Sequence, residues 1–332
     1  MATLNNGIIT VADVIKREAP DGKIAAIVEL LRQRLPILDH IPAVEGNLPT
    51  GNETTQRDSL PTGQLRGPNE GITSEKSTTV QIRDTACRLE GDSLVDVINV
   101  ERNGNSASFL ASEDAAFIQG LGNTMSSYLF YGNTLANPKE MNGINTRLNS
   151  LSGNAGRQVV NAQGVGSDNT SVVFCSWNKD TLAGIYPKGK KGGLYQEEAT
   201  KKDRVTDSTG RSYYAYVTRY VWELGLMVRD PRAFARVANI DVSDLNAGTG
   251  TMAGTALLDY LIRAKNKIRS GEGRKVMYCS EDVKTALEIM AKNASANAVK
   301  IVEAAGQFKT MFFDFEVAVS DSILLTESAV TA

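Results

Sequence analysis

The longest run of strand-like sequence lies between residues 194 and 224, and it constrains the fold more than any other feature. Two segments, 194–205 and 211–224, flank a turn at Asp207-Ser208-Thr209-Gly210, an arrangement typical of a β-hairpin. Strands of about 14 residues would reach about 45 Å. Alternation in the second segment gives apolar bulk to both faces, with Tyr214, Tyr216, Thr218, Tyr220 and Trp222 on one and Tyr213, Ala215, Val217, Arg219 and Val221 on the other.

A hairpin of this length is too long for its own domain to cover, and an isolated two-stranded ribbon is only marginally stable in water. We therefore predict that residues 184–228 form a projecting arm that a neighbouring copy covers. The alternative is two ordinary strands of a central sheet. The predicted subunit contacts are aromatic anchors, a candidate ion pair that fixes the angle of the arm, and a basic patch: Tyr213, Tyr216, Tyr220, Trp222, Arg229, Asp230, Lys188 and Lys190.

The chain before this hairpin divides into an irregular part and a helical part. Residues 1–78 form a predicted N-terminal arm and extended segment, because 36–78 are rich in Pro, Gly, Asn and Thr with only isolated apolar residues. Such a segment is either disordered or extended across a neighbour. A strand is predicted over 78–89. A helix about 30 Å long is predicted over 112–131, where apolar residues recur at helical spacing after a capping serine.

The C-terminal third predicts a small α/β layer. Helices are expected near 254–268 and after Ser280-Glu281-Asp282, alternating with strands at 275–279 and 313–319. We therefore expect an α+β protein in four parts. These are the N-terminal segment 1–78, a domain of residues 79–183 containing the long helix, the arm 184–228, and an α/β domain 229–332 whose end returns to the sheet of the preceding domain.

Catalytic and metal-binding chemistry has little support in the sequence. Any Ser-His-Asp or Cys-His set would have to use His40, because it is the single histidine. Neither a Gly-x-Ser-x-Gly elbow nor an HExxH motif is present. The three cysteines are far apart and are predicted to be apolar packing residues: Cys87, Cys175 and Cys279. We expect no cofactor and no metal. The remaining enzyme hypothesis places a site between the two halves, near the glycine-rich residues 248–254.

Charge and hydropathy limit the possible partners. The chain has 36 Lys and Arg against 38 Asp and Glu, a net charge of −2, which gives no basic surface for tight DNA recognition. Charge this close to zero also leaves self-association electrostatically unopposed. Residues 1–10 lack the pattern of a signal peptide, and no apolar run reaches the ~18 residues of a membrane span. We expect a product made in the cytoplasm that does not enter a membrane.

Three stretches of the second half, Ile185-Tyr186-Pro187-Lys188-Gly189, 213–220 and 222–241, resemble the major capsid proteins of tailed bacteriophages with the HK97-like fold. The resemblance extends from about Leu89 onward. It implies a shell subunit with an N-terminal arm, a peripheral domain with a long spine helix, an axial α/β domain, and an extended loop that lies on the next subunit.

The order of these elements is open at this point. In the family the extended loop precedes the spine helix, whereas the hairpin at 194–224 follows the helix at 112–131. Either residues 36–78 are the extended loop, or the elements of this chain are rearranged. The β-propensity of the hairpin favours the rearranged order.

The resemblance implies a structural function. Many copies would form pentamers and hexamers of an icosahedral virion shell, which encloses double-stranded DNA by geometry and without sequence-specific binding. Decoration, scaffolding and portal proteins are further implied partners. The alternatives are a nanocompartment shell of the same fold and the cytoplasmic enzyme described above.

Overall fold

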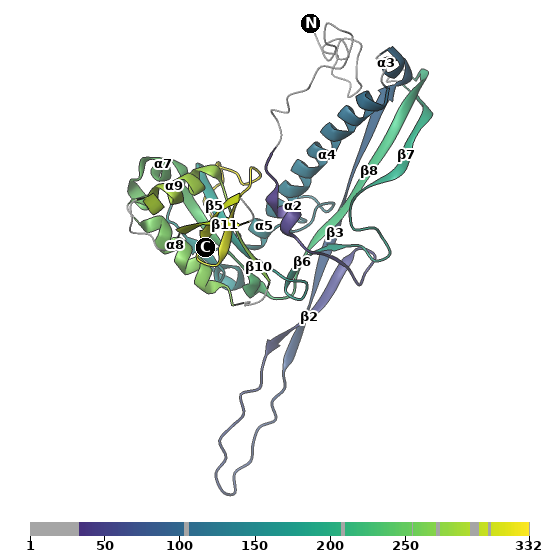
Figure 1. Ribbon diagram of the computed structural model, residues 1–332. Helices are drawn as coiled ribbons and strands as arrows, with labels where there is room; N and C mark the ends of the chain where they lie inside the picture. The colour runs from purple at the N-terminus through teal and green to yellow at the C-terminus, as the bar shows by residue number, and fades with distance from the viewer. Residues whose placement is uncertain are drawn as a thin grey trace.

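The fold is built on two β-sheets joined by one long helix (Figure 1). The computed structural model describes residues 33–331, except 103–105, 207–209, 254, 270–272, 293–298 and 305–306. Residues 1–32, the first part of the predicted N-terminal segment 1–78, lie outside the described ranges. No helix within these ranges is long and apolar enough to cross a membrane.

The first sheet has the strand order β1-β6-β8-β3-β2, and β7 pairs with β8 away from this path. Its β1–β6 pair is parallel, whereas the pairs of β8 with β6, β3 and β7 are antiparallel. The strands are β1 (Ala43–Glu45), β2 (Gly51–Ser59), β3 (Thr78–Asp96), β6 (Leu182–Tyr186), β7 (Gly193–Thr206) and β8 (Ser212–Val228).

The predicted hairpin is therefore β7 and β8, but it is not a free arm. Strand β3 pairs with β8 from Ala86–Gly225 to Asp96–Ala215, so β8 has a strand on each side. The prediction that residues 184–228 project without cover from their own chain is wrong, and the alternative of strands in a central sheet is correct. The physical reason is the length of β3, which continues to Asp96, seven residues beyond the predicted 78–89.

The element that projects is the β2–β3 hairpin. Figure 1 shows these two strands continuing into residues 60–77, which reach away from both sheets and contain no helix or strand. The projecting segment thus precedes the long helix in the chain. The expectation of a rearranged element order is wrong, because the strongest β-pattern belongs to a strand inside the sheet.

The long helix α4 (Ser106–Tyr131) runs beside the first sheet (Figure 1). It starts six residues before the predicted 112–131 and follows the short helix α3 (Val97–Arg102). Its buried residues Leu121, Met125 and Leu129 occupy the apolar stripe that the sequence predicts. A further short helix, α2 (Pro36–His40), packs against α4.

The second sheet has the order β11-β12-β13-β10-β5-β9-β4. Its strands are β4 (Val159–Asn161), β5 (Asn169–Trp177), β9 (Phe234–Asp241), β10 (Arg274–Cys279), β11 (Val299–Ala304), β12 (Gln307–Phe312) and β13 (Phe315–Val319). Since β4 and β5 come from residues before 229, this layer is not confined to the predicted range 229–332.

Both faces of the second sheet are covered. Along β5, Val172 and Phe174 pack with the helices, whereas Val173 and Cys175 belong to the core shared with α4. This two-sided burial explains the continuous apolar run of β5. The helices are α7 (Val242–Ala247), α8 (Ala256–Lys267) and α9 (Glu281–Lys292), and short turns of helix lie at α5 (Ile144–Arg147), α6 (Gly153–Gly156), η1 (Pro231–Ala233) and η2 (Gly250–Met252).

A buried carboxylate links α4 to the second sheet. The side chains of Glu327 and Arg236 are each 5% exposed and form an ion pair of 2.8 Å. Glu327 also accepts hydrogen bonds from the Tyr131 hydroxyl at the end of α4 (2.5 Å), from Asn145 on α5 (3.2 Å) and from Ser171 on β5. Burial and the nearby carboxylate raise the pKa of Tyr131, so this hydroxyl keeps its proton and remains a donor.

We expect Glu327→Ala to lower the free energy of unfolding by about 3–5 kcal/mol, because it leaves the Arg236 guanidinium buried without a counter-charge. The matched control is Glu281→Ala, which removes an ion pair with Arg34 whose side chains are 53% and 54% exposed. That change should cost about 1 kcal/mol or less. Guanidinium unfolding followed by tryptophan fluorescence measures both. Equal effects of the two substitutions would contradict the proposed importance of the buried pair.

Candidate subunit interface

The projecting loop, residues 60–77, exposes apolar side chains. Leu60, Leu65 and Ile72 are 68%, 104% and 67% exposed, and Val80 on the adjoining strand is 49% exposed. No other part of the described chain packs on them. Large apolar residues grouped on a projection are typical of a surface that a partner covers.

Hydrogen bonds across the two legs of the projecting loop hold its shape. The Glu75 carboxylate accepts from the backbone amides of Thr62 (2.7 Å) and Gly63 (3.1 Å), and the Gln64 side chain accepts from the amide of Thr73 (3.1 Å). The bond from Thr62 is the largest cause of a lowered pKa for Glu75. The loop therefore has internal structure of its own although it lacks helix and strand.

The root of the hairpin is fixed by a buried aspartate. Asp84 on β3 accepts from the backbone amide of Val228 (3.0 Å) and pairs with Arg147 on α5 (2.8 Å). Gly51 at the start of β2 has φ +151°, and a Cβ there would lie 2.0 Å from the Asp84 carbonyl oxygen. These contacts set the direction in which the hairpin leaves the body.

The predicted aromatic anchors lie mostly inside the subunit. Tyr220 is 7% exposed and hydrogen-bonds Asp114 on α4, and burial raises the pKa of its hydroxyl to about 12. Trp222 packs against the large core shared with α4, and Tyr216 packs against a small cluster around Phe109. Tyr220 is therefore covered within its own subunit, whereas Tyr216 and Trp222 are half-buried and stay predicted contacts. Tyr213, half-buried near the turn end of β8, stays a predicted contact.

Arg229 and Asp230 do not form the predicted ion pair. Asp230 pairs with Arg232 (2.9 Å) and caps the turn η1, whereas Arg229 lies 3.8 Å from Asp180. The side chain of Arg232 lowers the pKa of Asp230. The prediction failed because the short helical turn after residue 230 brings Arg232, not Arg229, to the carboxylate. The pair that sets an arm angle is Asp84–Arg147.

Lys188 and Lys190 lie exposed on the loop between β6 and β7. Their backbone amides bond Leu48 O (3.2 Å) and Pro187 O (3.1 Å), so the loop is tied to the base of the β2 strand. Within the described ranges neither ammonium group has an ion-pair partner. Both therefore remain candidates for contact with a neighbour.

A charged face of the first sheet escaped the sequence analysis. Arg88 pairs with Glu90, with Glu223 (3.0 Å) and with Glu197 (3.2 Å), and farther along Arg219 pairs with Asp92 (2.9 Å). Four carboxylates thus surround two guanidinium groups. The period-two charges at positions 88, 90 and 92 were the available signal, but the cross-strand partners come from β7 and β8.

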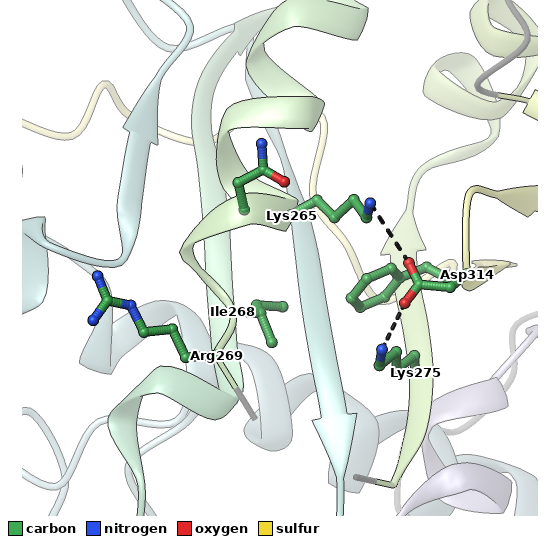
Figure 2. A pocket seen from close by; sticks show the side chains of 7 residues that line it. Lys265, Ile268, Arg269, Lys275 and Asp314 are labelled. Atoms are coloured by element: carbon green, nitrogen blue, oxygen red, sulfur yellow. Dashed lines mark hydrogen bonds and ion pairs between the residues drawn. The ribbon is translucent and has the colours of Figure 1, made fainter. Parts of the chain in front are cut away.

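A shallow hollow at the end of α8 is shown in Figure 2. Both oxygens of Asp314 face lysines, with Lys275 at 2.6 Å and Lys265 at 3.8 Å. Lys265 also lies 4.2 Å from the ring centroid of Phe313. One carboxylate thus faces two ammonium groups, and the described residues that line the hollow include no nucleophile with an adjacent base.

The described residues 248–253, where the enzyme hypothesis places its site, contain no histidine or cysteine. Gly248 ends α7 in the left-handed conformation (φ +67°), and the Asp244 carboxylate accepts from Thr251 N at 2.8 Å. Residues 248–253 lie between α7 and α8 and include the short turn η2. In the described ranges no group of three His, Cys, Asp or Glu side chains is placed to hold a metal ion.

Comparisons with known proteins identify relatives along nearly the whole chain. Residues 19–331 match the family described as major capsid protein GP7. The chain is similar to the bacteriophage Epsilon15 structure, with 31% identity, 100% of both chains covered and a TM-score of 0.77. The bacteriophage JBD30 capsid shares 11% identity over 95% of this chain and 99% of that chain, with a TM-score of 0.50. No curated protein matches the sequence.

We expect Asp84→Ala to loosen the hairpin root, because it leaves the Val228 amide without its acceptor and the Arg147 guanidinium, which keeps only backbone carbonyl acceptors, without a counter-charge. Unfolding free energy should fall by about 3 kcal/mol or more. Amide hydrogen exchange should accelerate in residues 51–59 and 78–85. Glu53→Ala is the control, since it removes an exposed pair with Arg83 on the same hairpin. Unchanged exchange in Asp84→Ala would show that the root is held by other contacts.

Proposed function

The chain belongs to the family of the major capsid protein GP7, and from this premise we propose how its copies hold one another. It is a structural protein with the HK97-like fold, and many copies form the icosahedral shell of a tailed phage. The observation that carries this conclusion is the match of residues 19–331 to the family. The enzyme and nanocompartment alternatives are set aside.

The projecting hairpin is the extended loop that lies on a neighbouring copy. Three features support this role. The hairpin leaves the body in a direction fixed by Asp84, hydrogen bonds to Glu75 hold its loop together, and its apolar residues are exposed in their own subunit. Covering Leu60, Leu65 and Ile72 would contribute hydrophobic free energy at about 25 cal/mol per Å² of apolar surface buried. The loop needs little further ordering to dock, which limits the entropic cost.

The two sheets divide the subunit into the parts that the family resemblance implies. The first sheet with α4 is the peripheral domain and its spine helix, and the second sheet with α7, α8 and α9 is the axial domain. The axial domains would meet around the centre of each pentamer or hexamer. Support comes from the separate cores on the two sides of the second sheet and from the shared core under α4.

Charge complementarity supplies a second contact. The exposed ammonium groups of Lys188 and Lys190 would pair with the carboxylate-rich face around Glu90 and Glu197 of a neighbour. Such pairs at the rim of an interface guide orientation and association rate more than they add affinity.

The remaining partners follow from the shell. The shell would contain double-stranded DNA by enclosure, because a net charge of −2 provides no basic groove for gripping it. Decoration, scaffolding and portal proteins are further expected partners. A capsid of JBD30 decorated with minor capsid protein trimers has 10% identity to this chain over 96% of both chains, with a TM-score of 0.46.

We expect Leu65→Asp to prevent shell closure while leaving the fold of the subunit unchanged, because the side chain is fully exposed in the single subunit and covered only in the assembly. The matched control is Leu135→Asp, since Leu135 is 94% exposed but lies after α4, away from the loop. Sedimentation and electron microscopy of particles made with each variant measure assembly.

Normal particles from Leu65→Asp would refute the docking role of the loop and leave the family assignment intact. Loss of particles with both variants would indicate a general solubility effect. Unfolding curves of the two variants, which should coincide with that of the parent protein, separate assembly defects from folding defects.

A further inference from the structure

The segment 33–42 forms a strap across the junction of α4 and the second sheet. Ile37 is fully buried in the core beneath α4, and the Leu35 side chain lies against Gly122 of α4. At one end Arg34 pairs with Asp321 (3.0 Å), in the loop that follows β13. At the other end, beyond α2, the strap leads directly into β1 and then the projecting hairpin.

The second sheet holds this strap through the only histidine of the chain. His40 Nδ1 lies 3.1 Å from the hydroxyl oxygen of Tyr278 on β10, and the two rings have centroids 5.8 Å apart. Tyr278 is fully buried, and its oxygen accepts a hydrogen bond from Trp177 Nε1 at 2.9 Å. Its ring also meets the edge of Phe130 from α4 (5.9 Å).

The hydrogen bonds of the Tyr278 hydroxyl with Trp177 and His40 are all satisfied only when the imidazole is neutral. Trp177 can only donate, so it occupies one acceptor position of the Tyr278 oxygen. The hydroxyl proton of Tyr278 then needs an acceptor, and Nδ1 of neutral His40 is the group within reach. Protonation converts Nδ1 into a donor, which leaves the buried hydroxyl proton without its acceptor and places a charge in a half-buried site.

The charges around His40 do not offset this cost. Arg274 on β10 and Lys309 on β12 disfavour the imidazolium, while Glu316 on β13 and Asp39 on α2 favour it. The Glu316 carboxylate is partly occupied, because it is shared by Arg274 (3.0 Å) and Lys309 (2.7 Å). Burial first, and then Arg274, lower the pKa of His40 below its ordinary value.

We propose that His40 is a pH-sensitive latch, which secures the strap 33–42 on the second sheet when the imidazole is neutral and loosens it when the imidazole is protonated. The hold is complete above the ordinary pKa of histidine, about 6.5. It weakens as the pH falls below that value towards the lower pKa of the folded state. The latch is a property of the single subunit and goes beyond the shell function.

Trp177 reports directly on this latch. The chain has two tryptophans, so full-length protein carrying Trp222→Phe isolates the emission of Trp177. Between pH 8 and pH 5 we expect one titration step with its midpoint below 6.5. Amide exchange in residues 35–41, corrected for its intrinsic pH dependence, should rise several-fold over the same range, while exchange in α8 stays constant.

The decisive variant is His40→Gln, whose side-chain oxygen can accept from Tyr278 but does not titrate. It should abolish both the emission step and the rise in exchange, and it should keep the strap protected at pH 5. A step that persists in His40→Gln would overturn the proposal. A His40 titration that leaves amide exchange of the strap unchanged would also overturn it, because protonation of the imidazole would then have no effect on how the strap is held. Tyr278→Phe checks the partner: it should weaken protection of the strap already at pH 8.

Discussion

The backbone of β3 needs hydrogen-bond partners along its whole length, and the arrangement of the first sheet follows from how it finds them. From Thr78 to Thr85 the partner is β2, and from Ala86 to Asp96 it is β8. The change of partner occurs between adjacent residues, where Asp84 and Gly51 close the gap. The first part of β3 therefore belongs to the projecting hairpin and the second part to the central sheet. The packing of the central sheet thus determines where the loop projects.

Buried polar contacts fix the position of the two sheets relative to each other. Glu327 ties α4, α5, β5 and β9 together, and Tyr278 does so for α4, the strap and β10. Apolar packing alone is weakly directional, whereas these hydrogen bonds are satisfied in one relative orientation only. The long helix is thus fixed at its C-terminal end, near both contacts. Its other half lies along β3 and β8.

The sequence predicted the amphipathic helices best, because their spacing is local: α8, α9 and most of α4 were expected. The hairpin of β7 and β8 was located correctly. The pairing of β3 with β8 was missed, because Gly91, Asp92 and Ser93 interrupt the strand pattern of β3. Residues 36–78 were predicted to be disordered or extended across a neighbour, whereas the structure places the helix α2 and the strands β1 and β2 in this range before the projecting loop. Pairs such as Arg147–Asp84 and Arg236–Glu327 join residues that are 63 and 91 positions apart in the sequence. No local sequence pattern predicts such pairs.

The change of partner along β3 has a mechanical consequence. A pull on the loop along the strand axis reaches the β3–β8 ladder in the shear direction, because antiparallel hydrogen bonds lie perpendicular to the strands. All the pairs from Ala86–Gly225 to Asp96–Ala215 then share the load, instead of opening one after another as in peeling. The loop is in this sense a tensile tie anchored in the body of its subunit.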